Sequence, residues 1–267
     1  MSDKIIITLT TIIGRLTSNN PNGIISCIES LCNQNYDNYE VHFNVPTTCR
    51  LSGDPLIIPT WLAESEIKYP HLKIYRVDDA GPITKLLPTL HRVTDPNAII
   101  IVVDDDLVYD TNMCSEHAIQ QNKYLKKCAI GYDGMDSKNG PIFNDVRDHF
   151  VVSIYRDVEV KMLQHYKSVS YLRSFFDQDF FTDFVGKTSS DDVLVSCYMS
   201  KKKIRKMSVA YDKEPPLKTL EEWRETGGVT TFPVLRHTNH EGGQGCNDPR
   251  AGQRFFIPQE FISAGYI

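Results

Sequence analysis

The sequence lacks any Cys-x-x-Cys pair, although it contains seven cysteines among 267 residues. An odd, scattered set of cysteines favours reduced thiols inside a cell over a disulfide framework or a zinc site. No apolar run approaches the roughly 18 residues needed to cross a bilayer, and the first residues do not resemble a signal peptide. We therefore expect a cytoplasmic protein with no membrane span.

The chain also lacks an excess of basic residues. Its 29 Lys and Arg are outnumbered by 34 Asp and Glu, for a net charge of −5. This balance argues against general nucleic-acid binding, and we expect no nucleic-acid partner. Internal repeats and low-complexity tracts are absent as well. The length suits one large α/β domain, or a domain with an appended lobe, and is enough to bury a sizeable core.

What the chain does contain is an apolar run, 98–103, followed at once by Asp104, Asp105 and Asp106. An apolar, largely β-branched run without alternation predicts a strand buried on both faces, as at the centre of a parallel sheet. Unpaired carboxylates are too costly to bury, so these three belong at the carboxyl end of the strand, where open α/β sheets bind ligands. Closely spaced carboxylates suit a hard cation such as Mg²⁺ or Mn²⁺. A solvated acidic turn is the alternative.

The first half of the chain alternates strands and helices. A strand at 5–11, a helix from Ile24 to about Asn33 and a strand at 39–45 form a βαβ opening, which implies a parallel sheet. The rest of the pattern predicts a short helix at 59–67, a strand at 72–77 and a helix at 111–127.

Between the third strand and the acidic strand lies Asp79-Ala-Gly-Pro-Ile-Thr-Lys85-Leu. Gly81 permits a tight turn and Pro82 suits the first turn of a helix, which puts Lys85 about one turn in. A helix amino terminus with a nearby cation favours a phosphate. An ordinary amphipathic helix with a solvated Lys85 is equally compatible with the pattern.

The second half is less regular. We expect a loop over 132–148, strands at 150–154, 158–163 and 169–172, and an aromatic set within 173–184 that is either core or a sugar-stacking surface. A helix begins after Ser190, a natural cap, with Asp191 and Asp192 in its first turn. Helix-start chemistry alone explains both acids. Because the two differ by about 100° around the helix, they are not expected to face one ligand together.

A glycine-rich stretch near the carboxyl end contains His237 and His240. A neutral imidazole there suits a metal ion. A hydrogen-bonded or surface role is the commoner one for such histidines.

The order of these motifs resembles the GT-A-fold glycosyltransferases, in particular family-2-like enzymes of bacteria and of large DNA viruses of algae and amoebae. The resemblance covers about residues 4 to 245 and rests on the Asp79–Leu86 segment, the Asp-x-Asp at Asp104–Asp106 and the acids after Ser190. It implies one GT-A domain, a mostly parallel sheet flanked by helices with a smaller acceptor-side lobe. Residues 1–110 would bind the nucleotide sugar, and 111–267 would bind the acceptor and catalyse.

The resemblance also implies roles for individual residues. Asp106 matches a direct Mn²⁺ or Mg²⁺ ligand, and Asp104 matches a residue shared between the metal and the donor ribose. His237 or His240 would complete the metal site, with His237 preferred. The residues implied to line the UDP-sugar donor are Thr10, Arg15, Asp79, Lys85, Asp104 and Asp105.

Catalysis in this family needs a carboxylate base separate from the metal cluster, because the acceptor hydroxyl must lose its proton as it attacks. Asp192, or its neighbour Asp191, matches that base, although the usual motif ends in Glu-Asp. The implied activity is metal-dependent, inverting transfer of a sugar from a UDP-sugar to a hydroxyl of a glycan or glycoconjugate. Similarity to viral members would place this activity in a host cytoplasm. The sequence does not indicate an oligomeric state.

Three other classes fit part of the pattern. A haloacid-dehalogenase-type phosphatase also uses a strand ending in Asp-x-Asp, but that strand usually lies near the amino terminus. A sugar nucleotidyltransferase ordinarily carries a glycine-rich, basic loop after the first strand, where this chain has only Gly14 and Arg15. A non-catalytic sugar-binding protein would keep the fold without turnover.

Overall fold

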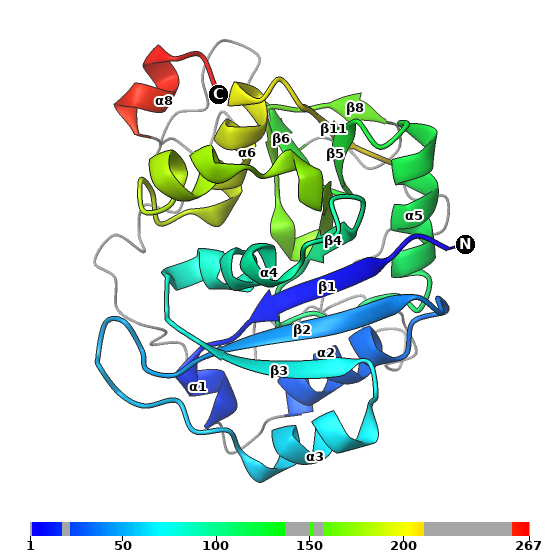
Figure 1. Ribbon diagram of the computed structural model, residues 1–267, viewed down its shortest axis with the longest axis vertical. Helices are drawn as coiled ribbons and strands as arrows, with labels where there is room; N and C mark the ends of the chain where they lie inside the picture. The colour runs from blue at the N-terminus through cyan, green and yellow to red at the C-terminus, as the bar shows by residue number, and fades with distance from the viewer. Residues whose placement is uncertain (1, 18–21, 137–149, 152–156, 211–257, 267) are drawn as a thin grey trace.

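The computed structural model describes residues 2–17, 22–136, 150–151, 157–210 and 258–266 (Figure 1). Its centre is an eight-stranded sheet in the order β3-β2-β1-β4-β10-β5-β11-β8. The bounds are β1 Ile5–Thr10, β2 Tyr39–Pro46, β3 Leu72–Val77, β4 Ile99–Val102, β5 Cys128–Gly131, β8 Val158–Glu159, β10 Val169–Leu172 and β11 Arg205–Ser208. A second, three-stranded sheet has the order β7-β6-β9, from β6 Gly134–Asp136, β7 Phe150–Val151 and β9 Met162–Leu163.

The first four strands of this order are parallel, and β10 runs antiparallel between β4 and β5. Chain order reverses between β1 and β4, which makes the carboxyl ends of these two strands a topological switch point. Val169 at the start of β10 pairs with Val102 at the end of β4. The segment before β10 therefore reaches the same edge of the sheet as the residues that follow β4.

One face of the sheet is covered by α2 Asn22–Cys32, α3 Thr60–Lys68 and α5 Met113–Lys123, whose buried residues belong to one core cluster. In Figure 1, α2 and α3 lie next to each other at the bottom, and α5 lies at the right. Ile5, Ile7 and Leu9 of β1 pack in this layer with Ile99 and Ile101 of β4. All five side chains are fully buried. The period-two alternation of the strands thus puts half of each apolar run into this core.

The other face carries the short 3-10 helix η1 Gly81–Lys85, α4 Leu87–Arg92 and α6 Asp191–Lys201. Ile100 and Val102 of β4 point into this layer, so β4 is buried on both faces as its sequence predicts. The remaining α-helices among the described residues are α1 Ile13–Leu16, whose Leu16 packs in the first layer, and α8 Gln259–Ser263, whose Phe261 packs in the second. The observed class is the expected α/β fold with a mostly parallel central sheet flanked by helices.

Most departures from the predicted elements fall in the second half. The predicted strand 158–163 is two strands, because β8 pairs with β11 of the large sheet and β9 pairs with β6 of the small one. The expected loop 132–148 contains β6, and the predicted helix 111–127 ends at Lys123, before the unpredicted β5. β11 was not predicted either. Of the predicted strand 150–154, only β7 lies within the described residues.

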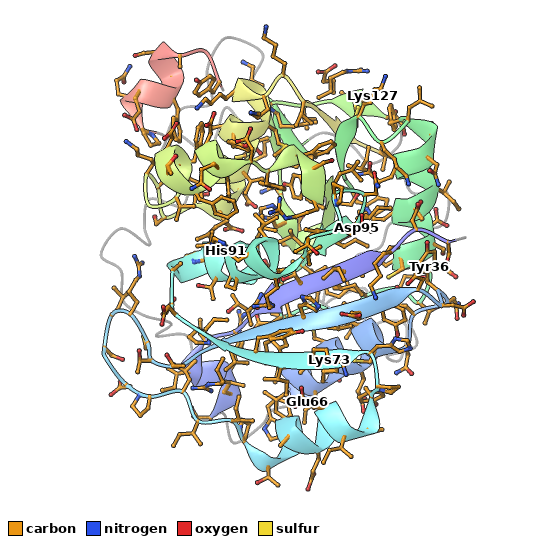
Figure 2. The ribbon with its side chains drawn as sticks, in the orientation of Figure 1. Tyr36, Glu66, Lys73, His91, Asp95 and Lys127 are labelled. Atoms are coloured by element: carbon orange, nitrogen blue, oxygen red, sulfur yellow. The ribbon has the colours of Figure 1, made fainter. Side chains whose placement is uncertain are left out.

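The aromatic set is core rather than a sugar-stacking surface for its three most buried members. Phe176, Phe180 and Phe184 are at most 3% exposed and pack around Tyr198 of α6. Phe181 is only partly buried, and its ring centroid lies 4.5 Å from that of His91, an exposed residue of α4 labelled in Figure 2. This packing joins α4 to the segment before α6.

Five of the seven cysteines are free and buried, as expected for reduced thiols: Cys27, Cys32, Cys114, Cys128 and Cys197. Cys49 is disulfide-bonded, so the expectation of a wholly reduced set was wrong at this position. A scattered spacing does not reveal which cysteines the fold brings together. Among the described residues, no helix has the length and apolar character needed to cross a membrane.

Candidate functional site

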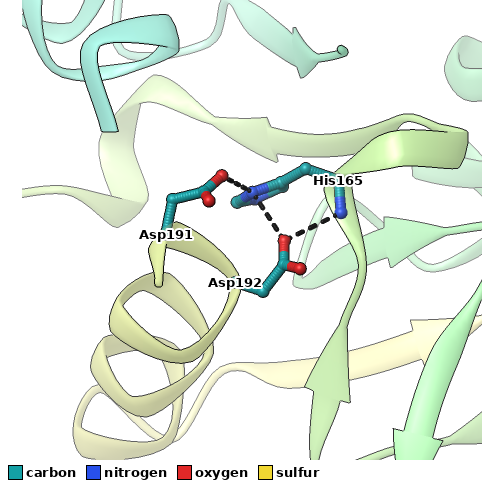
Figure 3. A group of neighbouring side chains, drawn as sticks. All are labelled: His165, Asp191 and Asp192. Carbon is teal, nitrogen blue, oxygen red and sulfur yellow. Dashed lines mark hydrogen bonds and ion pairs between the residues drawn. The ribbon is translucent and has the colours of Figure 1, made fainter. Parts of the chain in front are cut away.

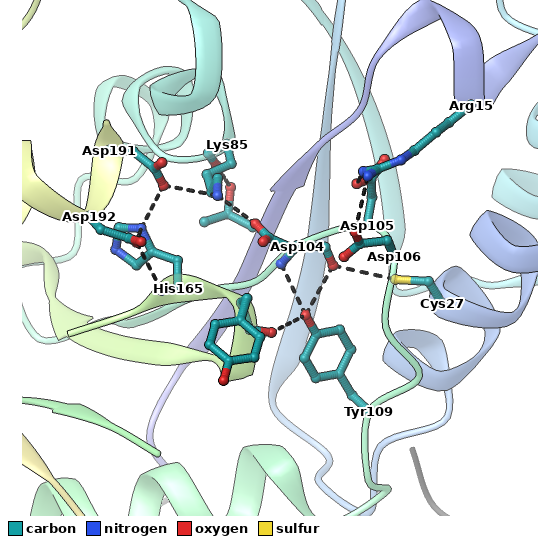
Figure 4. Close-up of polar contacts among 12 residues, drawn as sticks. Arg15, Cys27, Lys85, Asp104, Asp105, Asp106, Tyr109, His165, Asp191 and Asp192 are labelled. Atoms are coloured by element: carbon teal, nitrogen blue, oxygen red, sulfur yellow. Dashed lines mark hydrogen bonds and ion pairs between the residues drawn. The ribbon is translucent and has the colours of Figure 1, made fainter. Parts of the chain in front are cut away.

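Asp104, Asp105 and Asp106 lie one residue beyond the end of β4, at the switch point of the sheet (Figure 4). The hydroxyl of Tyr109 accepts a hydrogen bond from the Asp104 backbone N–H and lies 3.0 Å from the Asp104 carbonyl oxygen. It also contacts the carbonyl oxygen of Tyr166, 3.1 Å away. The strand end is therefore fixed in position by a side chain that also contacts the segment before β10.

Arg15, predicted to line the donor, binds two carboxylates of the triplet. Its Nη1 contacts Oδ1 of Asp105, and its Nη2 lies 3.0 Å from Oδ2 of Asp106. Burial by itself lowers the pKa of Arg15, but the neighbouring carboxylates outweigh burial and raise it above its usual value. The guanidinium is therefore a permanent cation here. Oδ2 of Asp105 and Nε of Arg15 are buried and have no hydrogen-bond partner among the described residues.

Lys85 is buried between two acidic clusters, which excludes the alternative of a solvated lysine. Its Nζ lies 2.5 Å from Oδ1 of Asp104 and 2.9 Å from Oδ2 of Asp191. Burial lowers the pKa of Lys85, but the two carboxylates outweigh burial and hold it above its ordinary value. The predicted metal cluster and the predicted base cluster are thus joined through one ammonium group.

The backbone of Lys85 is fixed by a buried polar cluster beneath it. Asn44 Nδ2 donates to the Lys85 carbonyl oxygen at 3.1 Å, and the Thr8 hydroxyl donates to the same oxygen. Thr89 Oγ1 lies 2.7 Å from Thr8 Oγ1 and accepts from Asn44 at 3.1 Å. These contacts tie η1 to β1, β2 and α4, so the ammonium group projects from a rigid support.

The turn before Lys85 offers fewer free donors than the sequence predicts. Asp79 accepts hydrogen bonds from the N–H groups of Gly81, at 2.8 Å, and Arg50, at 2.9 Å. The N–H of Ala80 donates to the Thr84 hydroxyl at 2.8 Å. Gly81 has a φ of +77° and starts a five-residue 3-10 helix in place of the predicted helix start, so phosphate binding at this turn stays a prediction. The ammonium of Lys85 remains as the cation.

The second acidic cluster begins α6. Ser190 caps this helix as expected, accepting from the Val193 N–H at 3.4 Å. Asp191 and Asp192 both turn toward His165, as Figure 3 shows. His165 Nδ1 lies 2.6 Å from Oδ2 of Asp191 and 3.0 Å from Oδ1 of Asp192. The two acids therefore contact one imidazole despite their angular separation, because each side chain can rotate toward it. That only one of them faces the acceptor stays a prediction.

Sequence reasoning missed His165. It lies in the 3-10 helix η3 His165–Lys167 immediately before β10, 26 residues ahead of Asp191, with no motif around it. Its side chain is 1% exposed, and its Nε2 lies 2.9 Å from the hydroxyl of Tyr171. Burial lowers the pKa of His165, but hydrogen bonds to Asp191 and Asp192 outweigh burial and raise it to about 9.

The charges of this cluster are balanced. Burial raises the pKa of Asp191, but Lys85 and His165 outweigh it and hold that carboxyl well below its usual range. Asp192 is more accessible, with a side chain 22% exposed. Among the described residues, no hydrogen bond or ion pair reaches its Oδ2. One carboxylate oxygen of the pair is thus open to a ligand.

Two sets of side chains have donors suited to a metal ion. His165, Asp191 and Asp192 offer three ligand atoms within 4.8 Å of one another, but both carboxylates already face the imidazole, and Asp191 also binds Lys85. Asp104 and Asp106 at the strand end offer hard carboxylate oxygens. Asp104 is 30% exposed, and its Oδ2 is unpaired among the described residues. By donor chemistry and access, the strand-end acids fit a divalent cation better.

Thr10, His237 and His240 are the remaining site residues predicted from the sequence. Thr10, at the end of β1, donates its hydroxyl to the Asn44 carbonyl oxygen at 2.7 Å and is partly buried. It lies at the switch-point edge with the acidic triplet, as expected from the parallel pairing of β1 and β4. His237 and His240 lie outside the described residues.

No protein-family model and no curated protein matches this chain by sequence. Among solved structures, S. aureus TarS 1–349 aligns with a TM-score of 0.51 and 14% identity, covering 79% of this chain and 58% of that one. GalNAc-T7, crystallised with UDP, GalNAc and Mn²⁺, aligns with a TM-score of 0.54 and 9% identity, covering 79% and 44%. The chain therefore spans only about half the length of these structures. Both are GT-A-type glycosyltransferases, and the α/β fold described above is the one that they share with this chain.

Proposed function

We propose that this protein is a metal-dependent, inverting glycosyltransferase that moves a sugar from a UDP-sugar to a hydroxyl of a glycan or glycoconjugate. The main support is one juxtaposition on a GT-A fold. A strand-end acidic triplet and a helix-start acidic pair lie on opposite sides of the buried Lys85 ammonium. One cluster suits the donor diphosphate with its metal, and the other suits the acceptor.

The donor side combines acids and cations. Asp104 and Asp106 are the candidate ligands of Mn²⁺ or Mg²⁺, and a cation held there would compensate the charge that develops on the leaving diphosphate. Lys85 lies 2.5 Å from Asp104 and would add a second positive charge beside the leaving group. The presence of UDP, GalNAc and Mn²⁺ with GalNAc-T7 supports the choice of donor and ion.

On the acceptor side, Asp192 is the candidate base. Its Oδ1 accepts from the backbone N–H of His165 at 3.0 Å, while Oδ2 is unpaired among the described residues. A carboxylate oxygen of this kind can take the proton of a hydroxyl as the hydroxyl attacks the anomeric carbon. Attack from the face opposite the leaving diphosphate inverts that carbon.

The test is a screen of nucleotide sugars for metal-dependent release of the nucleotide, first without an acceptor and then with glycan acceptors. We expect UDP release from one or a few UDP-sugars in the presence of Mn²⁺ or Mg²⁺. Asp106→Ala should abolish this release and the metal-dependent binding of UDP. Glu64→Ala on α3 removes the same charge from an exposed position and serves as the control.

Three results would contradict the proposal. Phosphate release from small phosphoesters, without any nucleotide-sugar turnover, would indicate a phosphatase. Formation of a nucleotide sugar from UTP and a sugar phosphate would indicate a nucleotidyltransferase. Sugar binding without turnover of any donor would indicate a binding protein.

A further inference from the structure

His165 has no part in the proposed reaction so far, yet it contacts both acids of the helix-start pair. We propose that His165 is a positioning residue that holds Oδ1 of Asp192 through a hydrogen bond from its backbone N–H and an ion pair with its imidazole, leaving Oδ2 to take the acceptor proton. This inference rests on the proposed function, because it assigns Asp192 as the base. It adds a residue to which no sequence motif points.

The contacts of His165 with the two acids fix the protonation of its Nδ1. The backbone nitrogen of His165 and its Nδ1 each lie 3.0 Å from the same atom, Oδ1 of Asp192. Nδ1 is also 2.6 Å from Oδ2 of Asp191. An imidazole nitrogen facing two carboxylate oxygens must carry a proton, because its lone pair would otherwise point at two negative charges. His165 therefore donates its Nδ1–H to Asp191 and its backbone N–H to Asp192, and its Nδ1 also lies within ion-pair distance of Asp192 Oδ1.

The neighbours of the His165 ring favour its charged form. His165 faces Asp191 and Asp192 of α6 and the hydroxyl of Tyr171 on β10, while Lys85 of η1 approaches from beyond Asp191. Two carboxylates against one uncharged hydroxyl favour the imidazolium, with its Nε2–H donated to Tyr171. The pKa raised to about 9 agrees with this arrangement.

Asp191 and Asp192 differ in their partners and in the exposed fraction of their side chains. Oδ2 of Asp191 is shared by Lys85 at 2.9 Å and His165 at 2.6 Å, and this side chain is 11% exposed. Asp191 is therefore an electrostatic link between Lys85 and His165. Asp192 is held on one oxygen only and is twice as exposed. Fixing one oxygen limits rotation of the carboxylate, so the other oxygen stays directed at the acceptor.

The experiment combines nitrogen NMR of the histidine rings with kinetics of His165→Asn. The asparagine amide can replace the Nδ1–H donor but carries no charge, whereas His165→Ala removes the donor as well. His91→Asn, at an exposed position on α4, is the matched control. His117 serves as an internal reference for the spectra, because burial lowers its pKa to about 3 and it should stay neutral.

We expect the His165 ring to be doubly protonated near neutral pH and to lose its proton as pH rises through about 9, with or without Mg²⁺. In His165→Ala, kcat should fall by roughly 10–100-fold while the donor KM stays near the parent value. His165→Asn should recover part of that loss. We expect kcat of the parent to decline as pH rises through about 9, and we expect His165→Asn to lack that decline. A merely structural histidine would not produce such a difference.

Several outcomes would overturn the inference. One is a neutral ring at pH 7.5, and another is loss of its proton on adding Mg²⁺ alone, which would make His165 a metal ligand. Parental kcat with an unchanged alkaline limb in His165→Asn would also overturn it. If no donor is turned over at all, the proposed function fails and the role assigned to His165 fails with it. The NMR result then still decides whether His165 is charged against the two acids.

Discussion

Two fully buried histidines lie on opposite faces of β10, and their surroundings favour different charges. His117, on the α5 side, lies between the hydroxyls of Ser168 and Ser170, at 2.8 and 2.9 Å. His165, on the α6 side, lies between two carboxylates and a phenol. Burial lowers the pKa of His117 to about 3, whereas the carboxylates outweigh burial at His165 and raise its pKa to about 9.

The comparison shows that burial alone does not decide the charge of a buried imidazole. With only hydroxyl partners the neutral form is favoured, and His117 serves packing and hydrogen bonding. With two acids beside it the charged form is favoured, and the same residue type joins an electrostatic network that reaches Asp104 through Lys85. One strand thus separates a neutral, structural layer from a charged layer that we assign to catalysis.

The largest expected effect comes from breaking the charged layer at its acids. Asp192→Asn keeps the shape of the side chain and its place in the first turn of α6. Transfer to an acceptor should fall by about 10² or more, the usual scale for removing a general base. Affinity for the donor should persist, because the strand-end acids are untouched. Transfer rates and donor affinities of Asp191→Asn and Asp192→Asn, measured side by side, check this.

Asp191→Asn is the informative partner of that experiment. It weakens the link between Lys85 and His165, so we expect a loss smaller than that of Asp192→Asn, together with a lower pKa for His165. Near-parental transfer by Asp192→Asn would remove Asp192 from the base position. If Asp191→Asn were the inactive variant, the base would be Asp191 and the mechanism would otherwise stand.

The next effect concerns the ammonium between the clusters. Lys85→Ala should weaken UDP binding by about 1.5–3 kcal/mol, the scale of a lost charge-assisted hydrogen bond, and should leave uridine binding unchanged. Because the variant leaves Asp104 and Asp191 without their shared cation, Lys85→Arg is the companion that retains the charge. Calorimetric titration with both ligands checks the prediction, and an equal change for uridine and UDP would exclude a diphosphate contact.

A smaller effect sharpens the contrast between the histidines through pH. The folded-state pKa of His165 is raised above its unfolded value of 6.5, so its stabilisation is complete below about pH 6.5 and is lost as pH rises through about 9. His117 has a lowered pKa, so it costs stability as pH falls below about 6.5.

We expect the parent to lose about 1–2 kcal/mol more than His165→Asn between pH 6.5 and pH 9.5, when the free energy of unfolding is measured in denaturant. His117→Asn should keep that alkaline loss and reduce the acid one. Parallel pH curves for the parent and His165→Asn would show that His165 does not change protonation on unfolding.

The smallest effect comes from the cap of the helix that carries the acids. Ser190→Ala removes a long, 3.4 Å hydrogen bond to the Val193 N–H, which should cost about 0.5–1 kcal/mol of stability. Ser189→Ala, one residue earlier, is the control. A large fall in the transfer rate of Ser190→Ala, measured where the variant is still fully folded, would mean that the cap also positions Asp192.

Much of the donor side follows from the sequence. The run ending at Val103 predicts a doubly buried strand, and three carboxylates after it must lie at the strand end. Lys85 was predicted near this end, but its burial between two acids was not, since the pattern around it fits a solvated helix equally well. Ser190 and the start of α6 follow from capping chemistry.

The acceptor side was harder to predict, for physical reasons. His165 and Asp191 meet only because β10 and α6 pack together, and no local spacing encodes that contact. The segment 158–163 looks like one strand, yet pairing with β11 and β6 in different sheets divides it. Short strands such as β5 depend on neighbours supplied by the fold rather than on a pattern of their own.

The reversed direction of β10 has a consequence for how this protein can diverge. In a run of parallel strands, the ligand edge of the sheet is reached only by the loops that follow the carboxyl ends of the strands. At β10 it is the segment before the strand that reaches this edge, because Val169 at the start of β10 pairs with Val102 at the end of β4. Changes in length before β10 would therefore alter the surroundings of Asp192 while the loop after β4 stays as it is. The two substrates of the proposed reaction would thus be recognised by different segments, which meet where Tyr109 contacts Tyr166.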